Sequence, residues 1–302
     1  MIASFYGRFC LLATVLVASN LQLVSTRSTE GPLRVLVLSS NVGTSHLQVA
    51  GALADALVDA GHKVDFLIPM WNSFVTSNGT KKANIRRLQL PNTAEIEAAM
   101  LAISSWNDAF EATVTAADWI AFGRMCAMHC EPLLTDRRLH AELRAARYDV
   151  AMAESFDLCA FALFRMLGVR STHEFSNLPL GENSALAHGL PVDWWNQPVF
   201  THHNQIEPIR TIGERVANWI EWTKLRFYTL PRQYGDADAT IRRILGPGFP
   251  TGRELLRAVD YVWENTNEQL ATPRLTSGRV KQIGGIAVPR VKELSEVSAT
   301  DG

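Results

Sequence analysis

The sequence predicts an α/β fold in which a Rossmann-like parallel sheet is flanked by helices. Residues 33–40 form a continuous aliphatic run rich in β-branched residues, which is typical of a buried parallel strand. After a short turn, apolar residues recur at three- and four-residue spacing over 47–58, and this spacing predicts an amphipathic helix that ends near Gly61. A second aliphatic run follows at 63–69. A strand, a helix and a strand in this order indicate a right-handed crossover unit.

Further strands and helices follow along the chain. Residues 93–147 are mostly helical in pattern, with breaks near Asn107 and Pro132. Residues 176–208, in which proline, tryptophan and histidine gather, predict a long irregular loop, and such a loop in a compact domain is usually functional. The other predicted strands are 84–91, 148–155, 169–175, 260–267 and 280–288, and the other predicted helices are 157–168, 209–230, 236–245 and 252–258.

The amino terminus has the pattern of a secretory signal peptide, which we place at residues 1–28. Arg8 precedes a short apolar run over 9–18, and small residues follow it. A signal anchor that stays in the bilayer is the alternative, but a spanning helix needs about 20 apolar residues and this run is about half that length. We therefore expect a chain of the secretory pathway, with its folded domain over 29–288 and a polar tail over 289–302.

The composition is that of an ordinary globular protein. Hydrophobic residues make up 47% and charged residues 20% of the chain. The net charge of −1 gives no electrostatic reason to expect binding to nucleic acid or to an anionic surface. Asn78, with Gly79 and Thr80, matches the acceptor triplet for N-glycosylation, a triplet that also occurs by chance.

Three cysteines lie beyond the signal segment, at positions 126, 130 and 159, so any one disulfide among them leaves a single thiol. Cys126, His129 and Cys130 share one face of a predicted helix, a spacing that zinc ligands can have. A fourth ligand at a recognisable spacing is absent from the sequence. The favoured interpretation is therefore a packed helix, and no metal is expected.

The turn between the first strand and the first helix is the leading candidate site. It lies at the carboxyl end of a parallel strand, where open α/β sheets bind ligands. The turn has neither the three glycines of a dinucleotide fingerprint nor the Gly-Lys-Ser/Thr of a P-loop. It does have Ser45 and His46 at a helix N-terminus, and a histidine there can act as a general base because its ordinary pKa of about 6.5 is near working pH. A histidine that only caps or packs is the alternative.

The long loop holds the other candidates. Trp194, Trp195 and Phe200 could line an apolar acceptor-binding pocket. Aromatic anchors that hold the loop against the domain are an equally good interpretation. His202 and His203 have no evident acidic or cysteine partner nearby in the sequence, and we interpret them as part of the loop structure.

Three segments, in order, resemble the UDP-glucuronosyltransferase family of UDP-glycosyltransferases. Residues 41–69 resemble its first motif, in which Ser-His opens a helix that ends in Gly-His. Residues 148–169 resemble the second, a Phe/Tyr-Asp strand ending in an acidic residue. Residues 260–288 resemble the third, in which Asn-x-x-Glu, Pro-Arg and Ile-Gly-Gly close the N-terminal domain. Together these three motifs span nearly the whole mature chain, and their order and spacing match those of the family.

The resemblance implies the acceptor-binding half of a GT-B glycosyltransferase. His46 matches the family's catalytic base, which takes the proton of an acceptor hydroxyl. The oxygen then attacks the anomeric carbon of a UDP-sugar, with inversion and release of UDP. The family has an aspartate that orients this histidine; the matching position here is Glu154, and Asp157 is the alternative. The resemblance also makes residues 106–128 a candidate wall of the acceptor pocket.

The family's donor-binding half has no counterpart in this sequence. Its Trp/Pro-Gln strand end, its His-x-Gly turn, its membrane anchor and its basic tail are all missing from the 302 residues. We therefore expect a UDP-sugar co-substrate to bind only together with a C-terminal domain, no resident cofactor, and no activity of this chain alone. The alternative is a non-catalytic acceptor-binding or regulatory partner of a full-length relative. The resemblance implies a location in the endoplasmic reticulum lumen.

Overall fold

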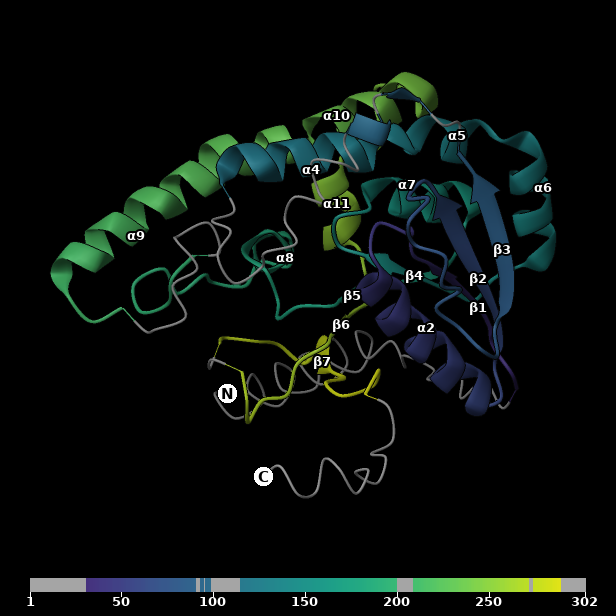
Figure 1. Cartoon of the computed structure of the whole chain (residues 1–302), viewed down its shortest axis with the longest axis horizontal. Coiled ribbons are helices and arrows are strands. Elements are labelled where there is room, and N and C mark those ends of the chain that lie inside the picture. The colour runs from purple at the N-terminus through teal and green to yellow at the C-terminus, as the bar shows by residue number, and fades with distance from the viewer. Residues whose placement is uncertain are drawn as a thin grey trace, which may run out of the picture. The chain divides into compact units, whose positions relative to one another are not determined.

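The computed structural model describes residues 31–90, 93–94, 96–98, 115–199, 209–271 and 274–288. The chain divides into two units, Met1–Pro32 and Leu33–Gly302, and the second contains the sheet and the helices that flank it (Figure 1). The predicted signal segment and the predicted polar tail lie outside the described residues. The boundaries proposed for them, and for the domain over 29–288, stay predictions.

The second unit is built on a parallel sheet. Within the described residues its strand order is β3-β2-β1-β4-β5-β6-β7, and every neighbouring pair is parallel. The strands are β1 (Arg34–Leu38), β2 (Lys63–Met70), β3 (Asn84–Gln89), β4 (Val150–Glu154), β5 (Ser171–Ser176), β6 (Tyr261–Glu264) and β7 (Val280–Gln282). The predicted α/β, Rossmann-like fold is confirmed. From β1 the chain first builds the sheet towards β3 and later, from β4, in the other direction, so β1 and β4 flank the topological switch point.

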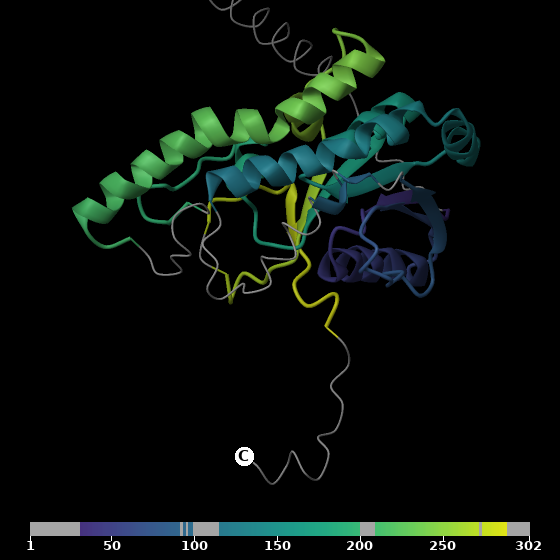
Figure 2. The ribbon, with the colours of Figure 1, turned by 45° about the horizontal axis from the view of Figure 1, so that its top comes forward.

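Helices cover both faces of the sheet. They are α2 (Thr44–Asp59), α4 (Ala116–Met128), α5 (Cys130–Thr135), α6 (Arg137–Ala146), α7 (Leu158–Leu167), α8 (Glu182–Ala187), α9 (Ile212–Lys224), the π-helical turn η2 (Leu225–Thr229), α10 (Leu230–Leu245) and α11 (Gly252–Arg257). In both views α4 and α10 run side by side above the sheet, while α2 lies on the opposite face (Figures 1 and 2). None of the described helices is both long and apolar enough to cross a membrane.

Strand β1 shows why the chain folds in these layers. Its side chains alternate between the two faces. Val35 and Val37 belong to the apolar cluster that α2 covers, and Leu36 and Leu38 belong to the larger cluster under α4, α5, α7 and α10. A strand buried on both faces needs a continuous aliphatic run, which is the pattern in the sequence.

The structure corrects three details of the predicted elements. The chain is continuously helical from Ile212 to Leu245, so the predicted break after residue 230 is wrong. Pro231 lacks the N–H that a regular helix would use, and the π-helical turn directly before it accommodates that interruption. Helix α8 lies inside the segment that was predicted to be irregular. The last two strands are both shorter than predicted. Strand β7 ends before a glycine turn in which Gly285 has φ +88°.

Candidate active site

His46 lies in the first turn of α2, at the carboxyl edge of β1. The helix begins directly after Gly43, whose backbone is extended. A Cβ atom at Gly43 would lie 3.3 Å from Cδ2 of His46, so a larger residue there would press on the imidazole ring. The side chain of His46 keeps 28% of its surface exposed.

Glu154 contacts this histidine from the neighbouring strand. It is the last residue of β4, and because Leu38 of β1 pairs with Ala153, the two strands end side by side. The carboxylate oxygens Oε1 and Oε2 of Glu154 lie 2.7 and 3.0 Å from Nδ1 of His46. Glu154 is only 3% exposed, so the carboxylate interacts with the imidazole rather than with solvent.

The contact with Glu154 determines the tautomer of His46 and raises its pKa. An ionised carboxylate can only accept hydrogen bonds, so Nδ1 of His46 carries the hydrogen, and in the neutral ring Nε2 then keeps its lone pair. Burial alone would lower the pKa of His46. The charge of Glu154 and its hydrogen bond outweigh that effect, and the pKa is raised above its ordinary value of 6.5. Glu154 therefore favours the protonated form of His46.

His46 and Glu154 line a cavity of about 240 Å³. Its apolar walls include Trp119 and Phe122 of α4 and Leu225 and Leu230 of the long helix. The part of the predicted wall at 106–128 that the structure describes therefore does border the cavity. Such walls around a few polar groups are typical of small-molecule sites.

One polar residue of the cavity was not found from the sequence. Asn177 follows β5, and both polar atoms of its side-chain amide are buried and have no hydrogen-bond partner among the described residues. Buried amides are normally satisfied, so this one is available to a ligand. Its place directly after a parallel strand, at the same edge as Glu154, was the signal that could have pointed to it.

The tryptophans predicted to bind the acceptor lie elsewhere. Trp194 packs with Val199 and Leu225 in a separate apolar cluster, and Trp195 is 53% exposed under the guanidinium of Arg215. Neither of them lines the cavity of His46. The structure therefore fits the alternative interpretation, in which these aromatic residues anchor the loop against α9. Phe200, His202 and His203 lie outside the described residues.

Two further predicted positions are exposed. Ser45 lies beside His46 in the first turn of α2, but its side chain points to solvent and does not line the cavity. Asn78 is exposed in the segment between β2 and β3, where its side-chain oxygen accepts a hydrogen bond from Arg87. Glycosylation of Asn78 stays a prediction.

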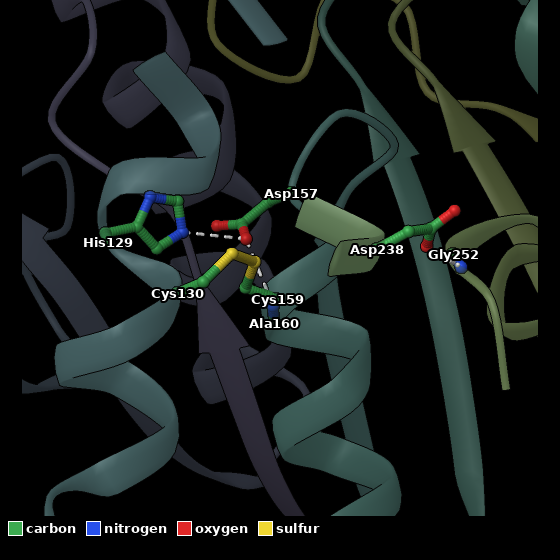
Figure 3. Close-up of a disulfide and its surroundings, with 7 residues drawn as sticks. All are labelled: His129, Cys130, Asp157, Cys159, Ala160, Asp238 and Gly252. Carbon is green, nitrogen blue, oxygen red and sulfur yellow. Dashed lines mark hydrogen bonds and ion pairs between the residues drawn. A yellow bond between two sulfur atoms is a disulfide. The ribbon is translucent and has the colours of Figure 1, made fainter. Parts of the chain in front are cut away.

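Asp157, the alternative partner for His46, contacts another histidine. Its Oδ1 atom lies 2.9 Å from Nε2 of His129 (Figure 3). Cys130 and Cys159 form a disulfide beside this pair, and Cys126 is a buried free thiol whose pKa is raised by burial and by the neighbouring carboxylates of Asp157 and Glu154. Cys130 is thus not a thiolate ligand, and no group of three or more metal-ligating side chains occurs in the described part of the chain.

The fold and the site together define an α/β protein with a histidine–carboxylate pair at the switch point of its sheet. Comparison with known proteins identifies the group within this class. The family model described as "UDP-glucoronosyl and UDP-glucosyl transferase" matches residues 34–299. The chain belongs to this family of glycosyltransferases.

Individual relatives agree with the family assignment. Two proteins of Caenorhabditis elegans named as UDP-glucuronosyltransferases are similar: ugt-47 is 22% identical over 84% of this chain and 47% of its own length, and ugt-46 is 25% identical over 89% of this chain and 50% of its own length. The chain thus spans about half the length of these relatives.

Among solved structures, the glycosyltransferase of kitacinnamycin aligns with a TM-score of 0.48 at 16% identity, over 88% of this chain and 54% of its own. TcCGT1, in complex with UDP, aligns with a TM-score of 0.44 at 15% identity, over 90% of this chain and 55% of its own.

Proposed function

We propose that this chain is the acceptor-binding half of a UDP-glycosyltransferase that transfers a sugar from a UDP-sugar to a hydroxyl group of a small lipophilic molecule. The observation that supports this function most directly is the His46–Glu154 pair at the edge of an apolar cavity. Family membership alone would not assign the chemistry, because function depends on the site.

The geometry fits general-base catalysis. Nε2 of His46 takes the proton of the acceptor hydroxyl, and the oxygen attacks the anomeric carbon, with inversion, as UDP leaves. Glu154 stabilises the imidazolium that forms and holds the ring in the tautomer that leaves Nε2 unprotonated. Glutamate is one methylene longer than the aspartate of the family, and here both of its oxygens lie within 3.0 Å of Nδ1.

The cavity suits an acceptor that is mostly apolar. Trp119, Phe122 and Leu225 would contact its rings or aliphatic parts, and the unpaired amide of Asn177 would bind a polar substituent. The UDP-sugar is a co-substrate in this proposal, with no resident cofactor. Its binding needs a C-terminal domain, so the chain alone is inactive.

The disulfide supports a location in the secretory pathway, in the lumen of the endoplasmic reticulum. Disulfides persist in oxidising compartments and are rare in the cytosol. Cys130 and Cys159 are both buried, so their bond is a structural one. The predicted signal segment and the exposed Asn78 fit the same compartment.

The proposal is tested in two steps. First, phenolic ligands are titrated into the 302-residue chain and binding is measured by isothermal titration calorimetry, which does not depend on any one tryptophan. Trp119→Ala should weaken binding at least tenfold, and Trp195→Ala, a matched change outside the cavity, should leave the affinity unchanged. Equal effects of the two substitutions would place the acceptor elsewhere.

Second, a chimera that joins this chain to the C-terminal half of ugt-46 is supplied with UDP-glucuronic acid or UDP-glucose and an acceptor that binds. His46→Ala should lower the rate of product formation by about 10²–10⁴-fold. UDP binding to the chimera is the control for a folded donor half. A chimera that binds both UDP and acceptor but forms no product would leave only the non-catalytic binding role.

A further inference from the structure

We infer that His129, Asp157 and the Cys130–Cys159 disulfide form a clamp that holds the turn from Glu154 to Asp157 and thereby positions Glu154 against His46. Figure 3 shows the four residues of this clamp together, between α5 and α7. The inference rests on the proposed function for its catalytic meaning, but the positioning itself is measurable without activity.

The hydrogen-bonded pair of the clamp is fully buried. His129 is 0% and Asp157 is 2% exposed, and their side chains meet at 2.9 Å. The same oxygen of Asp157 accepts a hydrogen bond of 3.0 Å from the backbone N–H of Ala160, so Asp157 also caps α7. Removing one partner leaves the other polar group buried without its hydrogen bond, which lowers the stability of the fold, so this pair is sensitive to substitution.

The disulfide connects the same two elements as the His129–Asp157 contact. Cys130 directly follows His129, and Cys159 lies two residues after Asp157. The junction of α4 and α5 is therefore joined to the start of α7 twice, once by a hydrogen bond and once by a covalent bond. Two adjacent links restrict rotation as well as separation of these elements.

The turn transmits this restraint to His46. The backbone N–H of Asp157 donates to the carbonyl of Glu154 at 3.0 Å, which closes the turn. Between these two residues, the ring of Phe156 meets the imidazole of His46 edge-on at 5.5 Å and the ring of Phe122 at 5.1 Å. The turn therefore contacts His46 with Glu154 and Phe156 and contacts the clamp with Asp157.

The two carboxylates of the turn contact different histidines. Glu154 contacts His46 of α2, and Asp157 contacts His129 at the junction of α4 and α5. Among the described residues, Cys126 of α4 is a further titratable group close to both carboxylates, and its raised pKa keeps it a neutral thiol. His129 thus holds Asp157 away from His46 and leaves Glu154 as the partner of the base.

The test follows the titration of His46 by NMR in the 302-residue chain with isotope-labelled histidine, and His46→Asn identifies the signal. Asp157→Ala and His129→Leu break the clamp, and Asp157→Asn and His129→Gln keep its hydrogen bond. We expect the first two to lower the pH midpoint of His46, because the contact with Glu154 weakens while burial remains. The conservative pair should stay close to the wild-type midpoint.

A midpoint that falls as far in Asp157→Asn as in Asp157→Ala would overturn the inference, because it would show a direct effect of charge. A midpoint unchanged in both disruptive variants, with native spectra, would overturn it as well. If neither disruptive variant folds, the double variant Cys130→Ser, Cys159→Ser removes the covalent link of the clamp and leaves Glu154 and Phe156 unchanged. The inference then requires a lower His46 midpoint, and an unchanged one refutes it.

These outcomes separate the inference from the proposed function. A shifted titration in the clamp variants, together with full transfer activity of the His46→Ala chimera, would keep the clamp and reject His46 as the base. An unshifted titration, together with loss of transfer in His46→Ala, would keep the base and reject the clamp.

Discussion

Gly123 of α4 lies close against the backbone of α10. A Cβ atom added there would lie 2.0 Å from the carbonyl oxygen of Gln233 and 2.7 Å from its carbonyl carbon. Ordinary contacts begin at 3.4 Å, so the two atoms would have to separate by about 1.4 Å (3.4 − 2.0). The obstructing atoms belong to the backbone and cannot rotate away. Gly123→Ala must therefore move one helix relative to the other.

The expected cost can be isolated with a matched substitution. Alanine in a helix interior is favoured over glycine by roughly 0.5–1 kcal/mol. A Cβ atom added at Gly235, in the interior of α10, would meet no atom within 4 Å, so Gly235→Ala should show that gain alone. Overpacking costs about 1–3 kcal/mol, so Gly123→Ala should lower the free energy of unfolding by a net amount of about 0–2.5 kcal/mol and lie about 1–3 kcal/mol below Gly235→Ala.

Urea unfolding followed by circular dichroism measures both variants under the same conditions. Ligand titration adds a functional readout, since Phe122 and Gln233 border the cavity on either side of this crossing, and acceptor affinity should fall in Gly123→Ala. If Gly123→Ala were as stable as Gly235→Ala and bound ligand equally well, the close approach of the two helices would be refuted.

Two more predictions concern other buried and hydrogen-bonded side chains. Asn218 is fully buried, and its side-chain amide donates a hydrogen bond of 2.6 Å to the carbonyl of Trp194. Asn218→Ala should therefore lower the free energy of unfolding by about 2–3 kcal/mol and speed proteolysis of the segment around Trp194. An unchanged cleavage rate would contradict this. Partial burial alone would raise the pKa of Asp55, but hydrogen bonds from the Thr80 hydroxyl and the Lys81 N–H outweigh burial and lower it. Because the folded pKa is depressed, this stabilisation is present above about pH 4 and is lost as the pH falls further. Asp55→Asn should therefore destabilise the protein less at pH 3 than at pH 7, and an equal difference at both pH values would contradict the assignment.

The sequence predicted the elements whose pattern is set by burial on both sides. Residues 33–40 and 63–69 could only be buried strands, and the spacing over 47–58 places α2 and its first-turn residue His46 at the edge of β1. Because β4 ends at an acidic residue, its carboxylate could be expected at the same edge. The choice between Glu154 and Asp157 depended on side-chain direction, which a sequence pattern does not carry, and the structure shows that Glu154 contacts His46.

The irregular segments could not be predicted in the same way. Helix α8 has only six residues, too few to show an amphipathic pattern. Its buried Ser184 hydroxyl donates to the carboxylate of Glu174, a contact that the sequence does not reveal. Trp194 and Trp195 could have faced either the cavity or α9, and the outcome depends on the buried amide of Asn218, far along the chain. The pairing of Cys130 with Cys159 likewise required the junction of α5 and α7 in three dimensions.

The π-helical turn η2 makes the cavity depend on the number of residues in one helix. Leu225 and Leu230 are five positions apart, yet both line the cavity, because the wider turn between them brings positions i and i+5 towards the same side. Deleting one residue between them would leave the two leucines four positions apart, a spacing that regular α-helical bonding also places on one side, so Leu230 and Gln233 would still face the cavity. Deleting a second residue would rotate α10 by about 100° relative to α9 and turn both side chains away from it. The cavity therefore tolerates the loss of one residue from this segment but not of two.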